Sequence, residues 1–430
     1  MSKPELLAPI QDWTSLSAAI QSGADAVFFG VKGFNMRAGA KNFTIKDLAK
    51  IAKITQAAKV KTYLTLNIII YQHELKKVEN LLRAVKKNKI NAIICWDLAV
   101  IELAKKFGVK FHISTQASIA NQLASNFYAK LGAERIVLAR ECDLRQITEI
   151  KKNSKAEVEI FAHGAMCVSV SGRCFMSQFL YGKSANRGEC QQPCRREYLI
   201  KQIDGGKELE LGEDYVLSPQ DLSTMPFIEK IFATKIDCLK IEGRNRSPEY
   251  VATVISCYRQ AIDFYFDNFG KKNFQRDFTT LKAELEKKLQ TVYHRGSSSG
   301  FLFGKPVDAW AHSDGNQATQ KKARIGRVTK LYNKINVAEI AIQDGEKVKV
   351  GDRLLIQGPV TGSYEVLVER LEVEHQSVTE VKQGDVFAIK LKREVKRNDE
   401  VFVIKSTQIK QPENNCHRNC SSCRGCPNKK

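Results

Sequence analysis

A strand-then-helix pattern that repeats through residue 241 constrains the fold of this chain more than any other feature. Short β-branched or apolar runs alternate with segments such as HELKKVENLLRAVKKNK, in which apolar residues recur at helical spacing. The runs cover residues 6–10, 26–29, 61–67, 92–96, 110–115, 135–139, 158–162 and 238–241. A repeat of roughly 25–30 residues predicts parallel βαβ units. Eight predicted strands favour a closed TIM-like α/β barrel, and an open doubly wound sheet stays the alternative.

The pattern also predicts the domain organisation. We assign residues 1–266 to the barrel, with a Cys-rich insertion at about 163–235 between the last two strands. An insertion of that length in a βα loop is usually functional. Residues 267–321 form a basic connector whose run GSSSG we expect to be flexible, and 409–430 a Cys-rich tail. Residues 322–408 alternate short strands with Asp-Gly and Gly-Asp turns, which predicts a small all-β barrel.

Charge and the N-terminal sequence bear on partners and compartment. With 68 Lys and Arg against 47 Asp and Glu, the formal net charge is +21. This excess favours binding to polyanions but does not choose between RNA, DNA and an anionic membrane surface, and a Lys-rich proteome would produce it too. The N-terminus MSKPELLAPIQDWTSL lacks an apolar signal core, and no stretch approaches the roughly 20 apolar residues of a membrane span. We therefore predict a cytoplasmic chain with no membrane partner.

In a reducing compartment clustered cysteines favour metal binding over disulfides. Cys167, Cys174, Cys190 and Cys194 have the spacing C-x6-C-x15-C-x3-C. Four loop thiolates suit an iron–sulfur cluster, whereas structural zinc sites favour paired C-x2–4-C knuckles. Cationic neighbours that would stabilise thiolates are Arg173, Arg187, Arg195 and Arg196. The alternative is four scattered free thiols.

A second group of cysteines lies in the tail. Cys416, Cys420, Cys423 and Cys426 precede Pro427 in the pattern C-x3-C-x2-C-x2-C-P, which is similar to bacterial ferredoxin ligand runs. A second iron–sulfur cluster, a zinc site and an unordered tail stay open here, because spacing alone does not separate iron–sulfur from zinc.

The motif EIFAHGAMCVSVSGRCFMSQFLYGKSANRGECQQPCRR resembles the U-32 peptidase family. ELLAPIQDWTSLSAAIQSGADAVFFG, ISTQAS, VLARE, YVLSPQDL and LKIEGRNRSPEYV resemble it as well, so the likeness covers nearly the whole chain. The family includes members described as collagenase-like proteases and iron–sulfur proteins needed for RNA or quinone-precursor hydroxylation. Length and the C-terminal domain, which is similar to domain 2 of elongation factor Tu, resemble the branch that hydroxylates tRNA.

That resemblance implies partners and a cofactor. It implies a 4Fe-4S cluster on the four cysteines of the insertion, with Cys238 as the substitute for an uncertain fourth ligand. It also implies tRNA as substrate, formation of 5-hydroxyuridine at the wobble position, and dependence on prephenate. Lys390, Lys392, Arg393, Lys396 and Arg397 of the β-domain fit phosphate contact or a solvated charged face equally well. The oligomeric state is not predicted.

Polar residues at the carboxyl ends of the predicted strands form the candidate pocket. We assign Glu141, His163, Glu242 and Arg244 to substrate binding or proton transfer. Arg140 and Arg244 suit the carboxylates of a prephenate-like molecule, because guanidinium groups pair bidentately with carboxylates. Alternatively, Glu242 and Arg244 form a buried ion pair that holds the strand ends together, and His163 is a core histidine.

Two other functions compete with hydroxylation. A U-32-type peptidase needs a nucleophile or a metal, yet the chain has no G-x-S-x-G elbow, no H-E-x-x-H motif and only 7 His. A non-catalytic tRNA-binding factor would bind tRNA without modifying it.

Overall fold

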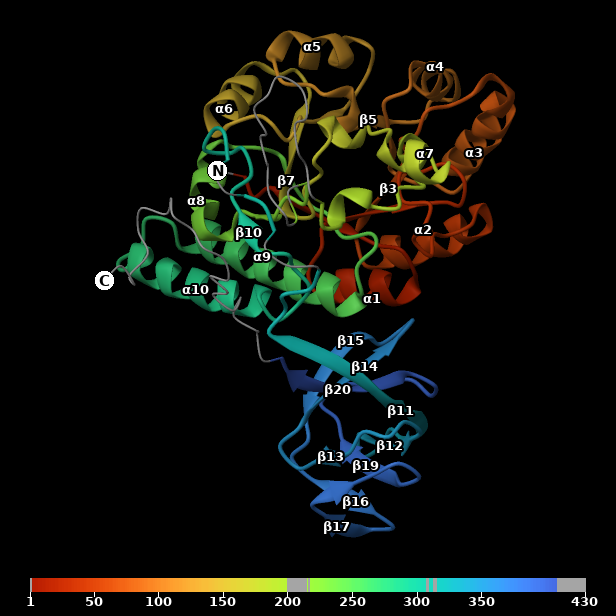
Figure 1. Ribbon diagram of the computed structural model, residues 1–430, viewed down its shortest axis with the longest axis vertical. Helices are drawn as coiled ribbons and strands as arrows, with labels where there is room; N and C mark the ends of the chain where they lie inside the picture. Colours follow the sequence, from red (N-terminus) through yellow and green to blue (C-terminus); the bar gives the residue numbers. More distant parts are fainter. Residues whose placement is uncertain (1, 199–214, 216, 307–308, 312–314, 408–430) are drawn as a thin grey trace, which may run out of the picture.

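The first unit of the chain is a closed barrel of parallel strands (Figure 1). The computed structural model describes residues 2–198, 215, 217–306, 309–311 and 315–407. The barrel strands are β1 (Glu5–Pro9), β2 (Ala26–Gly30), β3 (Lys61–Leu66), β4 (Ala92–Cys95), β5 (Phe111–Ile113), β6 (Arg135–Val137), β7 (Glu157–Gly164) and β9 (Cys238–Ile241). β9 pairs in parallel with both β1 and β7 and thereby closes the barrel. The predicted barrel is confirmed, and each of the eight predicted runs overlaps a strand.

Helices cover the outside of this barrel (Figure 1). They are α1 (Trp13–Gln21), α2 (Leu48–Ala57), α3 (Leu75–Lys87), α4 (Leu98–Phe107), α5 (Gln122–Lys130), α6 (Leu144–Asn153), α8 (Ile228–Ala233) and α9 (Pro248–Asn268). Short polar side chains begin several of them: Asp12, Asp97 and Asp143 each accept a hydrogen bond from a backbone N–H of the first turn. These helices pack on the sheet through an apolar face.

The barrel interior combines a thin apolar layer with buried ions. Leu7, Phe28 and Ile94 belong to the apolar layer. At the amino-terminal ends of the strands, Arg135 is 2% exposed and its guanidinium lies 2.6 Å from Glu5 and 3.4 Å from Glu159. Four charged residues therefore join four strands across the barrel: Glu5 on β1, Arg135 on β6, Glu159 on β7 and Lys240 on β9.

The long segment after β7 adds structure at the carboxyl end of the barrel. It contains α7 (Met176–Tyr181) and β8 (Asp221–Ser223), and β8 pairs antiparallel with the end of β7. The expectation that the run GSSSG is flexible is wrong, because β10 (Ser297–Ser298) pairs in parallel with β8. The connector also forms α10 (Phe274–Leu289), which packs against α9.

The second unit is an antiparallel β-domain, as predicted. Its strands are β11 (Gln320–Tyr332), β12 (Val337–Ile342), β13 (Val348–Lys349), β14 (Arg353–Gly358), β15 (Gly362–Leu367), β16 (Leu371–Val373), β17 (Gln376–Val378), β18 (Glu380–Val381), β19 (Val386–Lys390) and β20 (Glu400–Ser406). Ile325, Ile340 and Phe387 belong to its apolar core and are fully buried. The cysteines of the tail, residues 416–426, lie outside the described residues.

The β-domain meets the barrel through the turn between β14 and β15 (Figure 1). Ser17 and Gln21 of α1 donate hydrogen bonds to the carbonyl groups of Pro359 and Val360, at 2.6 and 3.0 Å. Arg393 donates to Gln21 at 2.6 Å, so this cation stabilises the domain contact. In the part of the chain that the structure describes, no helix is long and apolar enough to cross a membrane.

Replacing Arg135 should destabilise the barrel strongly. Arg135→Ala leaves Glu5 and Glu159 buried with less compensation, a change that costs about 3–5 kcal/mol in comparable cases. Urea unfolding should show a lower midpoint for this variant. The control is Arg145→Ala, whose side chain is 93% exposed and should leave the midpoint unchanged. Equal midpoints would mean that Lys61 at Glu5 and Lys240 at Glu159 neutralise the buried carboxylates without Arg135.

Candidate functional site

A cavity of about 110 Å³ lies at the carboxyl ends of the barrel strands. Strand ends and the insertion after β7 line it together. The charged and thiol side chains among its lining residues are Arg37, Arg140, Lys240, Glu242, Arg244, Cys167, Cys174, Cys190 and Cys194. Asn67, Ser114, Thr115 and Gln116, which follow β3 and β5, line it as well. The structure therefore brings the four cysteines of the insertion together with three of the five predicted pocket residues.

Local backbone contacts place the thiols. The N–H of Met176 lies 3.4 Å from the Cys174 sulfur and the N–H of Gln192 lies 3.4 Å from the Cys190 sulfur. Burial raises the pKa of the Cys194 thiol, and the other three cysteines raise it further, whereas Arg195 lowers it. All four thiols line the same cavity.

The donor set fits a thiolate-ligated cluster in number, type and surroundings. Four thiols share one cavity, backbone N–H groups point at two of them, and cations lie beside them. The four sulfur atoms are not arranged as metal ligands. Within the described part of the chain, no three His, Cys, Asp or Glu side chains are placed to hold a metal ion. Cys238 lies in the apolar interior of the barrel and does not line the cavity.

Arg37 faces the thiols and was not found from the sequence. Its guanidinium lies 3.3 Å from the carboxylate of Glu242, and Glu242, Cys167 and Cys190 raise its pKa. The loop after β2 carries Arg37 and packs tightly on the insertion: Ala38 donates to the Gly188 carbonyl at 2.9 Å. A Cβ on Gly188 would lie 2.2 Å from the Asn35 carbonyl oxygen, so only glycine permits this approach.

Glu242 is the one carboxylate among the described residues that line the cavity. Burial by itself would raise its pKa, but Arg37, Arg244, Arg140 and Lys240 together lower the pKa to about 2. The alternative prediction paired Glu242 with Arg244. That partner is wrong, because the ion pair of Glu242 is with Arg37. A carboxylate this acidic is ionised at neutral pH and is a weak base.

Arg140 and Arg244 each keep a free donor inside the protein. One nitrogen of Arg244 donates to Asn35 at 3.0 Å and to Thr65 at 2.9 Å, while its Nε is buried without a partner. Arg140 donates to the Ala165 carbonyl at 2.9 Å, and its Nε is likewise buried and unpaired. Burial lowers the pKa of both groups. Unpaired buried guanidinium donors on a cavity wall are the arrangement that an anionic ligand would satisfy.

The other two predicted pocket residues do not line this cavity. Glu141 is exposed at the surface. The ladder between β7 and β9 shifts register between Phe161 and His163, so the His163 ring packs between Tyr250 and Tyr258 of α9. Burial lowers the pKa of His163 to about 4, and the imidazole is therefore neutral.

Two arginines of the insertion hold the loop in place. Arg187 forms a bidentate pair with Glu74, at 2.6 and 2.7 Å. Arg195 donates to Ser218 at 2.9 Å and to the Pro219 carbonyl at 2.6 Å. These contacts fasten the cysteine-bearing segment to the barrel and to the segment before β8.

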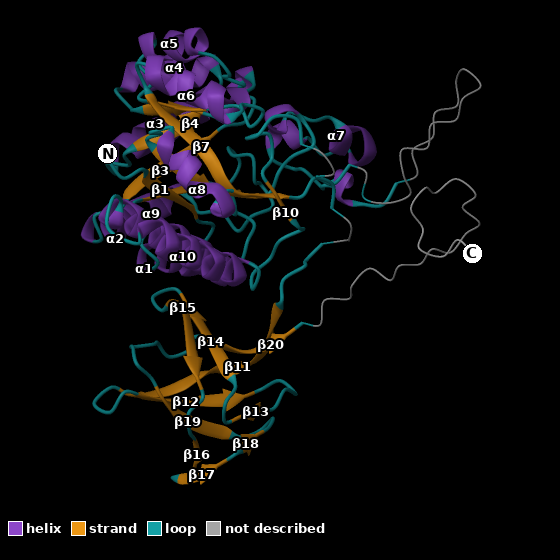
Figure 2. Cartoon of the chain, turned by 90° about the vertical axis from the view of Figure 1, so that its left-hand side faces the viewer, coloured by secondary structure: helices purple, strands orange, loops and turns teal. Residues whose placement is uncertain are grey.

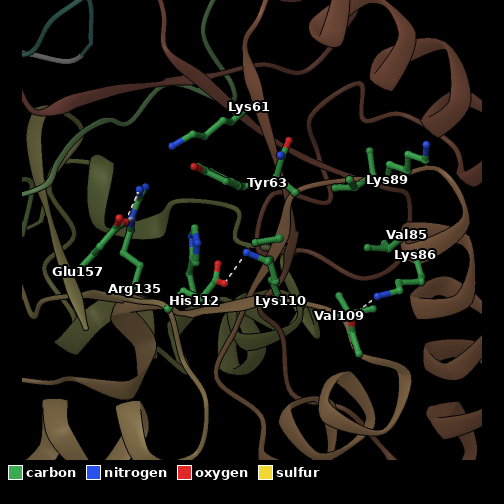
Figure 3. Close-up of a pocket in the computed structure, with 15 residues that line it drawn as sticks. Lys61, Tyr63, Val85, Lys86, Lys89, Val109, Lys110, His112, Arg135 and Glu157 are labelled. Carbon is green, nitrogen blue, oxygen red and sulfur yellow. Dashed lines mark hydrogen bonds and ion pairs between the residues drawn. The ribbon is translucent and has the colours of Figure 1, made fainter. Parts of the chain in front are cut away.

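A larger hollow of about 740 Å³ lies at the opposite, amino-terminal end of the strands (Figure 3). Lys61, Tyr63, His112, Arg135 and Glu157 line it. Several of its charges are paired: Arg135 lies 2.7 Å from Glu157, and Lys110 lies 2.7 Å from Glu134. Function in α/β barrels sits at the carboxyl ends of the strands, and the cysteines lie there, so the smaller cavity is the candidate site.

Comparison with known proteins gives the family. The model of peptidase family U32 matches residues 11–312. The chain belongs to peptidase family U32. It is 39% identical over 410 residues to a Porphyromonas gingivalis protein named collagenase, covering 93% of this chain and 97% of that one. It is 37% identical over 310 residues to tRNA hydroxylation protein P1 of Bacillus subtilis, covering 71% and 72%. It is also 32% identical over 350 residues to 23S rRNA 5-hydroxycytidine C2501 synthase of Escherichia coli, covering 80% and 52%. The predicted resemblance is confirmed, and the U32 relatives carry both hydroxylation and collagenase names.

Glu242 should make the free energy of unfolding depend on pH. Its folded-state pKa of about 2 lies below the ordinary value of 4.5, so its contribution to stability is present above pH 4.5 and is lost as the pH falls toward 2. The difference in unfolding free energy between wild type and Glu242→Gln should shrink by about 2 kcal/mol between pH 7 and pH 3. Urea unfolding with a chelator present measures it. Glu141→Gln, at an exposed position, is the control and should show no such trend.

Proposed function

We propose that this chain hydroxylates the wobble uridine of tRNA to 5-hydroxyuridine, using a 4Fe-4S cluster on Cys167, Cys174, Cys190 and Cys194 and prephenate as cosubstrate. The observation that carries the proposal is that these four thiols and the guanidinium groups of Arg140 and Arg244 line one cavity. U32 relatives named for tRNA and rRNA hydroxylation support RNA as the substrate. The net charge of +21 supports a polyanionic partner, and cytoplasmic location stays a prediction.

Each side chain of the cavity has a task in this proposal. The cluster, when bound, would supply one-electron chemistry. Arg140 and Arg244 bind the carboxylates of a small dicarboxylate through donors that have no partner within the protein. Glu242 holds Arg37 in place beside Cys167 and Cys190. Its low pKa makes it a positioning group for that cation rather than a proton donor.

Loss of a cavity thiol should remove both iron and activity. Protein purified without oxygen should contain about four irons and four sulfides and absorb visible light. Cys174→Ala should lose the iron, because the cluster would lack a ligand. In a deletion strain, wild type should restore 5-hydroxyuridine in tRNA hydrolysates analysed by mass spectrometry, and Cys174→Ala should not.

The matched control for that variant is Cys257→Ala, since Cys257 is fully buried on α9 away from the cavity. It should keep both iron and hydroxylation. A wild-type protein that holds zinc or no metal would contradict the redox proposal. A protein that binds tRNA but restores no hydroxylation would instead be a non-catalytic tRNA-binding factor.

Arg244→Lys should weaken binding of the cosubstrate. Lysine keeps the positive charge but loses the planar donor pair, and hydrogen bonds to charged groups contribute about 1.5–3 kcal/mol. We expect prephenate to raise the melting temperature of wild type, and the variant to need at least about tenfold more prephenate for the same shift. Arg173→Lys, at an exposed position outside the cavity lining, is the control. If wild type and Arg244→Lys need the same prephenate concentration for the same shift in melting temperature, Arg244 does not bind a dicarboxylate and that part of the proposal is wrong.

Peptidase activity is the second candidate, because a collagenase-named relative is 39% identical over nearly the whole chain. A thiol protease needs an imidazole base beside its nucleophile. No histidine is among the described residues that line the cavity, so no thiol there has that partner. Hydrolysis of gelatin by metal-free protein that is lost in Cys174→Ala would favour the peptidase.

A further inference from the structure

Exposed apolar side chains cluster on α7 and the residue before it. Phe179 is 84% exposed, Phe175 65%, Leu180 55% and Tyr181 39%. The rings of Phe175 and Phe179 are neighbours, with centroids 6.2 Å apart. Large apolar side chains gathered at the surface mark an interaction site, because leaving them in water is unfavourable. We call these four residues the α7 surface.

The α7 surface lies next to the cysteine cavity. α7 falls in the chain between Cys174 and Cys190, and Met176 at its start lines the cavity together with those two thiols. Figure 2 shows α7 projecting from the end of the barrel away from the N-terminus. A molecule that contacts the α7 surface is therefore held beside a segment that lines the cavity.

Cations border the α7 surface. Arg173, Lys183 and Arg196 are exposed. The guanidinium of Arg196 lies 5.4 Å from the centre of the Tyr181 ring, and that of Arg173 lies 5.8 Å from the ring of Trp96. Arg173 donates to the Ser118 hydroxyl at 3.0 Å, and within the described residues none of the three cations is paired with a carboxylate. Aromatic rings interleaved with unmatched cations are the composition of a single-stranded nucleic-acid surface.

We propose that the α7 surface stacks unpaired bases of an RNA loop beside the base that enters the cavity, while Arg173, Lys183 and Arg196 contact the phosphates. This inference rests on the proposed function. A base that is stacked in a duplex cannot reach side chains at the ends of the barrel strands, so the target base has to leave its stack. Extrusion removes stacking from the neighbouring bases, and exposed aromatic rings replace it without regard to sequence. An apolar protein surface would cover these side chains but leave the three cations unmatched, whereas RNA brings phosphates to pair with them.

Direct RNA binding by the full-length protein tests this surface. The probes are a fluorescent RNA hairpin with an unpaired loop and a fully paired RNA of the same length. Phe175→Ala/Phe179→Ala should weaken hairpin binding by about tenfold or more and leave duplex binding unchanged, because only unpaired bases stack. Both side chains are exposed, so the fold does not depend on them.

Two further variants complete the test: one is a control on another helix, and the other removes cations. Leu123→Ala/Phe127→Ala removes side chains that are 76% and 56% exposed on α5, and it should bind both RNAs as wild type does. Arg173→Ala/Lys183→Ala should weaken the binding of both RNAs. It should also reduce the slope of log affinity against log salt concentration, because phosphate contacts are lost.

The outcomes separate this surface from the proposed function. Hairpin affinity that is unchanged in the Phe175/Phe179 variant, or lost equally for duplex, overturns the inference. A change of oligomeric state in that variant without a change in RNA affinity assigns the surface to a protein partner and overturns it too. If wild type restores no 5-hydroxyuridine in cells yet hairpin binding depends on the two phenylalanines, the hydroxylation proposal fails and the RNA surface stands.

Discussion

Closure of the barrel through β9 is the constraint on which the rest of the structure depends. β9 pairs with β1 on one side and β7 on the other, so the loop after β2 and the turn after β9 come to face the same cavity. Arg244 and Asn35, which are 209 positions apart in sequence, are 3.0 Å apart in space as a result. Lys240 links the two ends of the interior, because it pairs with the buried Glu159 at 2.8 Å and also lines the cavity. Destabilising the ionic layer would therefore disturb the site above it.

The cavity carries more positive than negative charge from its own side chains. Glu242 balances Arg37, whereas Arg140 and Arg244 keep buried donors without partners. Leaving such donors unpaired costs free energy, and an anion in the cavity would recover it. Carboxylates are anions, so the field of these cations favours a carboxylate ligand.

The strand-helix repeat was enough to predict the barrel, because buried parallel strands are short apolar runs with little ambiguity in their spacing. The four cysteines were also predictable, since their residue type and spacing carry chemistry. Side-chain direction was not: the register shift before His163 turns its ring toward α9, and no sequence pattern marks that shift. Arg37 was missed because its place beside the thiols depends on a contact between two loops at Gly188. Lys240 was missed too, but a lysine within the apolar run CLKI could have revealed it. β10 was misjudged because backbone pairing with β8, and not side-chain pattern, makes it a strand.

Closure of the barrel by β9 determines the order in which the parts of the cavity wall come together. All four thiols lie within residues 167–194 and are synthesised before Glu242 and Arg244. The N-terminal half of the wall, with Arg37, is already synthesised at that moment, but β9 is still missing and the barrel is open. Only when β9 inserts do Glu242 and Arg244 join the thiols in one cavity, so the wall of the cavity is completed by the last strand of the barrel to be made.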